Sequence, residues 1–182
     1  MRPNLFSVSV NFRTTQKGSL WGNLQQAIGS GWPIGFLLRE TFESATDYDE
    51  AVSWLTNSKL IAPCYFTICG VKPNEGIIIT RRRKESEQPL ELDVEPFLVQ
   101  TNIDHWSDDP NEDIMVSIRR RKLAKRLLGN LMVQQTVNEE ELWKLISNDP
   151  ICNDITIYGT YICPSTAALV TRLPDPQGGF VL

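Results

Sequence analysis

Side chains capable of chemistry gather in one short stretch of the sequence, VQTNIDHW, at residues 99–106. The alternating segment PFLVQT (96–101) predicts a strand that leads up to Asn102, and Asp104 and the single histidine, His105, follow it. An amide, a carboxylate and an imidazole this close together indicate either a polar corner of the fold or the wall of an active site. Asparagine is frequent in turns, which favours the corner. No nucleophilic residue lies next to His105, so a surface or corner position is expected for it.

The elements that position this stretch can be predicted from hydrophobic periodicity and from turn residues. Helices are predicted at 20–28, 33–43, 46–59, 114–132 and 139–146. Strands are predicted at 5–12, 60–71, 76–83, 89–94, 96–101, 154–163 and 166–173. The pairs 60–83 and 154–173 have the pattern of antiparallel hairpins. This order predicts an α+β layered architecture, with antiparallel sheet between helices, in a single domain over residues 1–182.

Two of these helices carry recognisable starts. Thr46 with Asp49 three residues later predicts the N-cap of the helix over 46–59. Asn138 with Glu141 predicts the N-cap of the helix over 139–146.

Composition and charge argue against some classes of function. The net charge of −4 argues against a nucleic-acid partner held by a basic field. The basic runs Arg81–Lys84 and Arg119–Arg126 are interpreted as solvated faces. The N-terminal residues lack the apolar core of a signal peptide, which predicts a cytoplasmic protein if Met1 is the true start.

The cysteines do not form a metal-binding pattern. Cys64, Cys69, Cys152 and Cys163 include no CxxC pair, and the histidine is distant. Cys64 and Cys69 lie five residues apart in a predicted strand, so their side chains are expected on opposite faces. We interpret the four as buried free thiols and predict neither a metal nor another cofactor.

An ordered series of stretches resembles one known family. LFSVSVNFR, LLRETFESATDYDEAVSWL, LIAPCYF, GIIITRRRKES, LVQTNIDHW, the RRKLAK run and ITIYGT are similar to sequences of acid ceramidase and N-acylethanolamine-hydrolysing acid amidase. The resemblance extends from Leu5 to Pro176. It implies an N-terminal-nucleophile hydrolase fold, an αββα sandwich of two antiparallel sheets between helical layers. It also implies lysosomal hydrolysis of the amide bond of N-acyl lipids, by a cysteine exposed through self-cleavage.

The same resemblance assigns roles to individual residues. Asn102 matches the family asparagine that donates a hydrogen bond to the oxyanion. Arg120 matches the functional arginine, with Arg119 or Arg121 possible by a one-residue slip. Asp104 falls in the substrate corner after the asparagine. The apolar helix containing Trp32 and Phe36 would line part of the acyl pocket, or else belong to the core.

Departures from the family pattern lead to further expectations. No cysteine of the chain aligns with the nucleophile, Phe12 replaces an acidic residue, and Gln177 replaces a disulfide cysteine. We therefore expect an N-terminally truncated, incomplete catalytic domain that is inactive alone. Its expected partners are a missing N-terminal segment or α-subunit-like chain, an N-acyl lipid and a membrane surface. The alternative is a catalytically dead paralogue that binds lipid or a partner.

Overall fold

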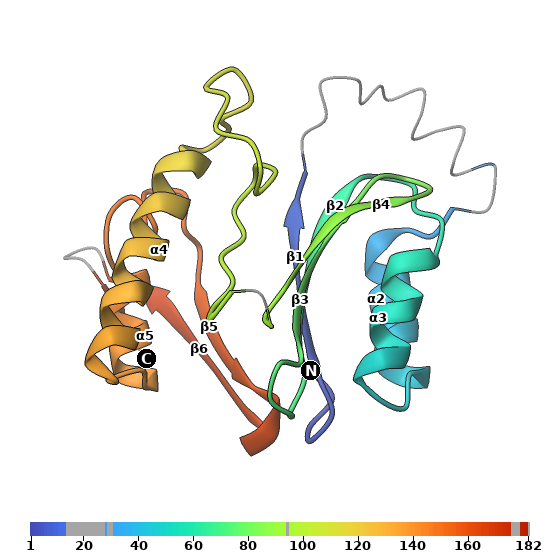
Figure 1. Cartoon of the computed structure of the whole chain (residues 1–182), viewed down its shortest axis with the longest axis horizontal. Coiled ribbons are helices and arrows are strands. Elements are labelled where there is room, and N and C mark those ends of the chain that lie inside the picture. The colour runs from blue at the N-terminus through green and yellow to red at the C-terminus, as the bar shows by residue number, and fades with distance from the viewer. Residues whose placement is uncertain (14–27, 29–30, 94, 176–178, 182) are drawn as a thin grey trace.

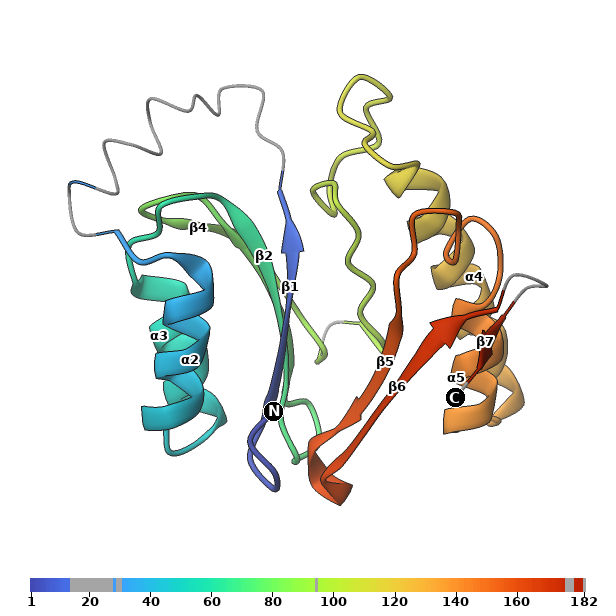
Figure 2. The same ribbon diagram turned by 180° about the vertical axis from the view of Figure 1, so that it is seen from behind.

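The computed structural model describes residues 1–13, 28, 31–93, 95–175 and 179–181, and these form four layers (Figure 1). Helices α2 (Ile34–Ser44) and α3 (Tyr48–Asn57) cover the outer face of one sheet. Helices α4 (Ser117–Gln134) and α5 (Glu139–Ile146) cover the outer face of the other. The view from behind shows the same helix–sheet–sheet–helix order (Figure 2). The predicted α+β layering is therefore confirmed.

Both sheets are antiparallel, and both predicted hairpins are present. The first sheet has the strand order β1-β2-β3-β4 and the second has the order β5-β6-β7. The strands of the first sheet are β1 (Ser7–Phe12), β2 (Cys64–Cys69), β3 (Gly76–Arg81) and β4 (Ser86–Glu91). Those of the second are β5 (Gly159–Cys163), β6 (Ala168–Pro174) and β7 (Phe180–Val181), with a 3₁₀ turn (Pro164–Thr166) between the first two.

The main hydrophobic core lies between the first sheet and its two helices. Every residue of β3 is buried, and alternate residues of β2 point toward α2 and α3. The buried cluster consists of Leu37, Leu55, Leu60, Cys64, Phe66, Ile68, Ile77 and Ile79. As expected for a five-residue spacing, Cys64 is buried and Cys69 is exposed on the other face. The interpretation of all four cysteines as buried is wrong, since Cys152 and Cys163 are also partly exposed.

The two predicted helix caps agree with the structure to within one residue, whereas α4 begins three residues later than predicted, at Ser117. Asn138 caps α5 by accepting a hydrogen bond from the Glu141 amide, as predicted. For α3 the cap is Asp47, not Thr46, because the Asp47 carboxylate accepts from the Glu50 amide at 2.8 Å. The Thr46 amide and hydroxyl instead both donate to the Glu50 carboxylate.

The prediction of a strand at 96–101 is wrong. Its residues from 98 are extended but pair with no described strand, and their polar groups turn to the start of α4 instead. The Thr101 hydroxyl donates to the Ser117 carbonyl at 3.1 Å, and the Asn102 amide donates to the Ser117 hydroxyl at 3.2 Å. An alternating pattern therefore reflects burial against helices here and not a sheet ladder.

Other predicted boundaries also shift. The strand predicted at 89–94 is observed at Ser86–Glu91, and residues 154–158 precede β5 without joining it. The helix predicted at 20–28 lies outside the described residues, apart from Ile28. None of the described helices has the length and apolar character needed to cross a membrane.

Arg81 contradicts the interpretation of the basic runs as solvated faces. Its side chain is fully buried and donates to the carbonyls of Leu55, Thr56 and Ser58. These carbonyls end α3, where the helix leaves acceptors without an internal partner and where positive charge is favoured. Arg81 therefore fastens α3 to β3 and acts as the C-terminal cap of the helix.

We expect Arg81→Met to lower the free energy of unfolding by roughly 3 kcal/mol, because buried carbonyls lose their donors. Urea denaturation measures this change. Arg82→Met is the matched control: Arg82 is 57% exposed, and its ion pair with Glu87 should contribute less than about 1 kcal/mol. Equal effects of the two substitutions would contradict the capping role.

Candidate active site

Asn102 is held on both sides of its amide. Its Nδ2 donates to the carbonyl of Phe12, the last residue of β1, at 3.0 Å. Its Oδ1 accepts from Arg120 Nη2 at 2.8 Å. Because guanidinium can only donate and a carbonyl can only accept, these two partners fix which end of the amide is which. One N–H of the NH₂ group donates to the Phe12 carbonyl, and the group carries a second N–H.

The geometry distinguishes the three adjacent arginines of α4. Arg120 reaches Asn102 and also donates to the Ser117 hydroxyl at 2.9 Å and to the Met115 carbonyl at 2.9 Å. Arg119 is exposed. Arg121 is 5% exposed and donates to the carbonyls of Asp104 and Ser107, so it holds the loop after Asn102. Of the three arginines, Arg120 is the one whose side chain contacts Asn102 among the described residues.

Asp104 is the centre of a partly buried ionic cluster. Arg13 binds its carboxylate with two hydrogen bonds, from Nε at 2.8 Å and from Nη2 at 2.7 Å. The Tyr65 hydroxyl donates to the same carboxylate at 2.6 Å. Arg13 also pairs with Glu87 at 2.8 Å. Asp104 therefore joins the loop after Asn102 to β1, β2 and β4, and its carboxylate is engaged by protein groups.

The charge of Arg13 is maintained by this cluster. The side chain is 4% exposed, and burial opposes its charge, but hydrogen bonds with Asp104 and Glu87 outweigh burial and raise its pKa. Burial raises the pKa of Tyr65, and its bond to Asp104 raises it further, so the hydroxyl stays a donor. The bidentate Arg13–Asp104 pair is the arrangement that gives guanidinium–carboxylate contacts both strength and direction.

Arg13, Tyr65 and Glu87 were not predicted as site residues. A signal for Arg13 exists in the sequence, because it follows an alternating strand directly and a charged residue there lies at a sheet end. Tyr65 offers no such signal, since a tyrosine inside an apolar strand is ordinarily core. Glu87 is the second residue of β4 and the strand partner of Thr80, and a single charged residue in a polar stretch gives no sign of such a pairing.

His105 lies at the corner predicted for it. Its ring meets Trp106 edge-on, with the centroids 4.6 Å apart. Within the described part of the chain, its Nδ1 is buried without a hydrogen-bond partner. Burial lowers the pKa of His105, Asp104 offsets part of this effect, and the charges of Arg121 and Lys125 lower it further.

Trp32 and Phe36 lie apart from this cluster. Phe36 lies in the first turn of α2 and Trp32 lies just before this helix, which covers the face of the first sheet opposite to the loop containing Asn102 (Figure 1). Phe36 is 65% exposed, and Trp32 lines a separate surface hollow with Trp54 and Ser58. Their predicted substrate contacts stay a prediction, and the described contacts do not connect them to Asn102.

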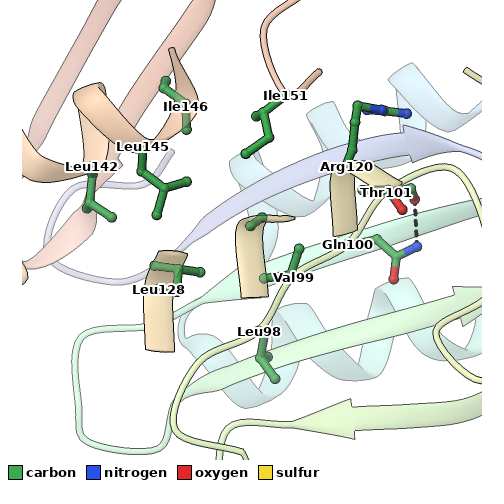
Figure 3. A pocket seen from close by; sticks show the side chains of 11 residues that line it. Leu98, Val99, Gln100, Thr101, Arg120, Leu128, Leu142, Leu145, Ile146 and Ile151 are labelled. Carbon is green, nitrogen blue, oxygen red and sulfur yellow. Dashed lines mark hydrogen bonds between the residues drawn. The ribbon is translucent and has the colours of Figure 1, made fainter. Parts of the chain in front are cut away.

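An apolar cavity of about 300 Å³ borders Arg120 (Figure 3). It lies between the extended segment 98–101, α4 and α5, and aliphatic side chains form most of its wall. The residues that line it are Leu98, Val99, Gln100, Thr101, Arg120, Ala124, Leu128, Leu142, Leu145, Ile146 and Ile151. Gln100 donates to the Thr101 and Ile103 carbonyls, and its buried Oε1 has no partner among the described groups.

Neither a metal nor a cysteine accompanies Asn102 in the described part of the chain. No three His, Cys, Asp or Glu side chains gather there in a way that could hold a metal ion. None of the four cysteines hydrogen-bonds to Asn102 or Arg120 within the same residues. What the site presents is an amide donor beside a cation.

We expect Asp104→Asn to lower the free energy of unfolding by about 3 kcal/mol, because the buried Arg13 loses its main counter-charge. Glu43→Gln is the control, since Glu43 and Arg39 form an exposed pair worth less than about 1 kcal/mol. Urea denaturation compares the two. A loss no larger than that of the control would show that Asp104 is not the centre of the cluster.

The lowered pKa of His105 predicts a pH dependence of stability. As pH falls through about 6.5, the unfolded chain binds a proton at this ring before the folded chain does, so stability falls. Urea denaturation at pH 7 and pH 5.5 measures the fall, and His105→Gln should reduce it. Since His105 is the single histidine, an unchanged fall in the variant would assign the effect to other groups.

Comparison with known proteins gives a consistent set of relatives. The chain is 38% identical to acid ceramidase of Pan troglodytes, 37% to that of Homo sapiens and 35% to that of Mus musculus. Each alignment covers 98% of this chain and 46% of the relative, so the chain spans about half the length of these proteins. No protein-family model matches the chain.

A solved structure shares the architecture. The Caenorhabditis elegans N-acylethanolamine-hydrolyzing acid amidase ortholog superposes with a TM-score of 0.71 at 29% identity. The superposition covers 89% of this chain and 67% of that one. The chain therefore belongs to the family of acid ceramidase and N-acylethanolamine-hydrolysing acid amidase, and its two layered sheets have the N-terminal-nucleophile hydrolase fold.

Proposed function

We propose that the chain supplies the carbonyl-binding corner of a lipid amidase of the acid ceramidase class. Its substrate is an N-acyl lipid, either ceramide, cleaved to sphingosine and fatty acid, or an N-acylethanolamine, cleaved to fatty acid and ethanolamine. The observation that carries the proposal is the amide of Asn102, fixed between Arg120 and the Phe12 carbonyl with a second N–H to donate. The site of action implied by the family is the lysosome.

The chemistry assigned to this corner is stabilisation of negative charge. A thiolate adds to the amide carbon, the carbonyl oxygen becomes an oxyanion, and the C–N bond then breaks as the amine takes a proton. Water hydrolyses the resulting thioester to the fatty acid. An Asn102 N–H aimed at the oxyanion needs no reorganisation during the reaction. The cationic bond from Arg120 to Oδ1 polarises the amide and strengthens its N–H as a donor.

We further propose that the nucleophilic cysteine belongs to a segment outside these 182 residues. Cys64 is a poor candidate, because it lies in the core and burial raises its pKa to about 12. Cys163 ends β5, beside the turn into β6, and its contacts are with Ser165. None of the four cysteines hydrogen-bonds to Asn102 or Arg120 among the described residues, which supports a sulfur outside this chain.

Unfilled surfaces support a partner of that kind. The two sheet orders place β1 and β5 at the edges of their sheets, and an edge strand can pair with an added strand. Large apolar side chains are exposed on or next to these strands. They are Val10, Phe12, Ile155, Ile157, Tyr158, Leu169 and Leu173. A nucleophile-bearing segment that packed here would cover them and would come close to the end of β1, where Asn102 is held.

The cavity beside Arg120 favours a lipid over a polar substrate. Its aliphatic wall begins next to the cation that holds Asn102, so an amide at Asn102 could direct an acyl chain into it (Figure 3). Trp32 and Phe36 remain candidates for a more distant part of the lipid.

A catalytically dead paralogue that binds lipid or a partner is the second candidate function. It is favoured by Phe12, which is 63% exposed at the position where the family pattern has an acidic residue. The coding sequence upstream of Met1 separates the two. A cysteine followed closely by arginine and aspartate supports the amidase, and a stop codon supports the paralogue.

The amidase proposal is tested on the longer protein that carries such a cysteine. Asn102→Ala should lower kcat by a factor of about 10²–10³ and leave KM nearly unchanged. Asn130→Ala, on an exposed position of α4, is the control. Thermal unfolding verifies that each variant folds. Unchanged kcat in Asn102→Ala, or hydrolysis by residues 1–182 alone, would each contradict the assignment.

A further inference from the structure

Two cysteines end strands that belong to different sheets. Cys69 is the last residue of β2 and Cys163 the last residue of β5. Cys69 is exposed and Cys163 is partly exposed. Alternation along β2 puts Cys69 on the same face as Tyr65, which contacts Asp104, and not on the face that packs against α2 and α3. Its side chain thus points to the side of the second sheet.

The N-terminal turn connects the surroundings of these two cysteines. Arg2 and Phe6 close a tight turn, with the Arg2 amide donating to the Phe6 carbonyl at 2.8 Å. At its tip the Asn4 amide donates to the carbonyl of Pro164, the neighbour of Cys163, at 2.9 Å. At its base Ser7 is the strand partner of Cys69. Both ribbon views show the β5–β6 turn and the N-terminal turn at the same end of the molecule (Figures 1 and 2).

The two thiols differ in reactivity. Hydrogen bonds from Ser165 and then Thr166 lower the pKa of Cys163 to about 7, so much of it is thiolate at neutral pH. Desolvation raises the pKa of Cys69, and the negative charge of Cys163 raises it further. Cys163 is therefore the nucleophile of the pair and Cys69 the resolving thiol.

We propose that Cys69 and Cys163 are a redox modification site that forms an intramolecular disulfide and fastens the first sheet to the second. The oxidant is a small disulfide such as oxidised glutathione. The Cys163 thiolate attacks one glutathione sulfur, which breaks the glutathione S–S bond and releases one glutathione thiolate. The Cys69 thiolate then attacks the Cys163 sulfur and releases the second. Two protein thiols are oxidised and one glutathione disulfide is reduced to two glutathione molecules.

The physical effect of this bond follows from the topology. The two sheets share no hydrogen-bonded strand pair among the described residues. A covalent link between residues 69 and 163 closes a long loop and restricts the unfolded chain. It also holds the N-terminal turn between the sheets. Cys64 and Cys152 serve as internal references, since Cys64 is buried in the core and Cys152 lies beyond α5.

The test uses the full chain at low concentration, incubated with oxidised glutathione, alkylated and digested with chymotrypsin without reduction. Cleavage after Tyr65 or Phe66 separates Cys64 from Cys69, and cleavage after Tyr158 or Tyr161 separates Cys152 from Cys163. Mass spectrometry should find the Cys69 peptide joined to the Cys163 peptide. The rate of formation should rise as pH passes through about 7, where the Cys163 thiolate forms.

Variants and stability complete the test. The crosslink should vanish in Cys69→Ser and in Cys163→Ser and persist in Cys152→Ser. Oxidation should shift the urea midpoint of the parent chain and of Cys152→Ser upward, and dithiothreitol should reverse the shift. Separate glutathione adducts on the two cysteines, a crosslink to Cys64 or Cys152, or a disulfide between two chains would each overturn the proposal. The crosslink in the parent chain decides the matter even if a serine variant does not fold.

Discussion

The buried pair of Arg13 and Asp104 is the interaction on which the candidate site depends. A guanidinium that is 4% exposed is stable only if its charge is matched, and Asp104 matches it with two hydrogen bonds. Tyr65 and Glu87 satisfy further positions of the same cluster. Because Arg13 directly follows β1 and Asp104 follows Asn102 by two residues, this pair brings the two segments together. As a consequence, the Phe12 carbonyl lies within hydrogen-bonding distance of the Asn102 side chain.

A second guanidinium completes the framework from the other side. Arg121 lies one residue from Arg120 on α4, yet it points into the loop after Asn102 and binds its carbonyls. Successive helical residues are turned by about 100°, so one side chain can fasten a loop while its neighbour reaches the amide. The corner is thus built from ionic and amide contacts that join the end of β1, β2, β4, the loop after Asn102 and α4. Asn102 does not follow a regular strand.

The sequence predicted those parts of the fold that depend on local pattern. The hairpins, the capped helix α5 and the opposite faces of Cys64 and Cys69 follow from periodicities of two and 3.6 residues. The segment 96–101 has the same alternation but packs against helices, and only the position of Ser117 reveals where its hydrogen bonds go. Arg81 and Arg121 belong to basic runs that pattern alone indicates as solvated. Their burial depends on helix ends and loop carbonyls that are distant in sequence. Family resemblance proposed Asn102 as a site residue. It left the choice among Arg119, Arg120 and Arg121 open, because the orientation of α4 is needed to resolve a one-residue slip.

The position of β1 has a mechanical consequence. Among the described strands, β1 lies at the edge of its sheet. Its final carbonyl, that of Phe12, is one of the two groups that orient Asn102. A further strand that paired with this edge would change the twist and the rigidity of β1 up to Phe12. Strand pairing at this edge and the orientation of Asn102 would then depend on the same piece of backbone, so that an added strand would act on the Asn102 amide directly.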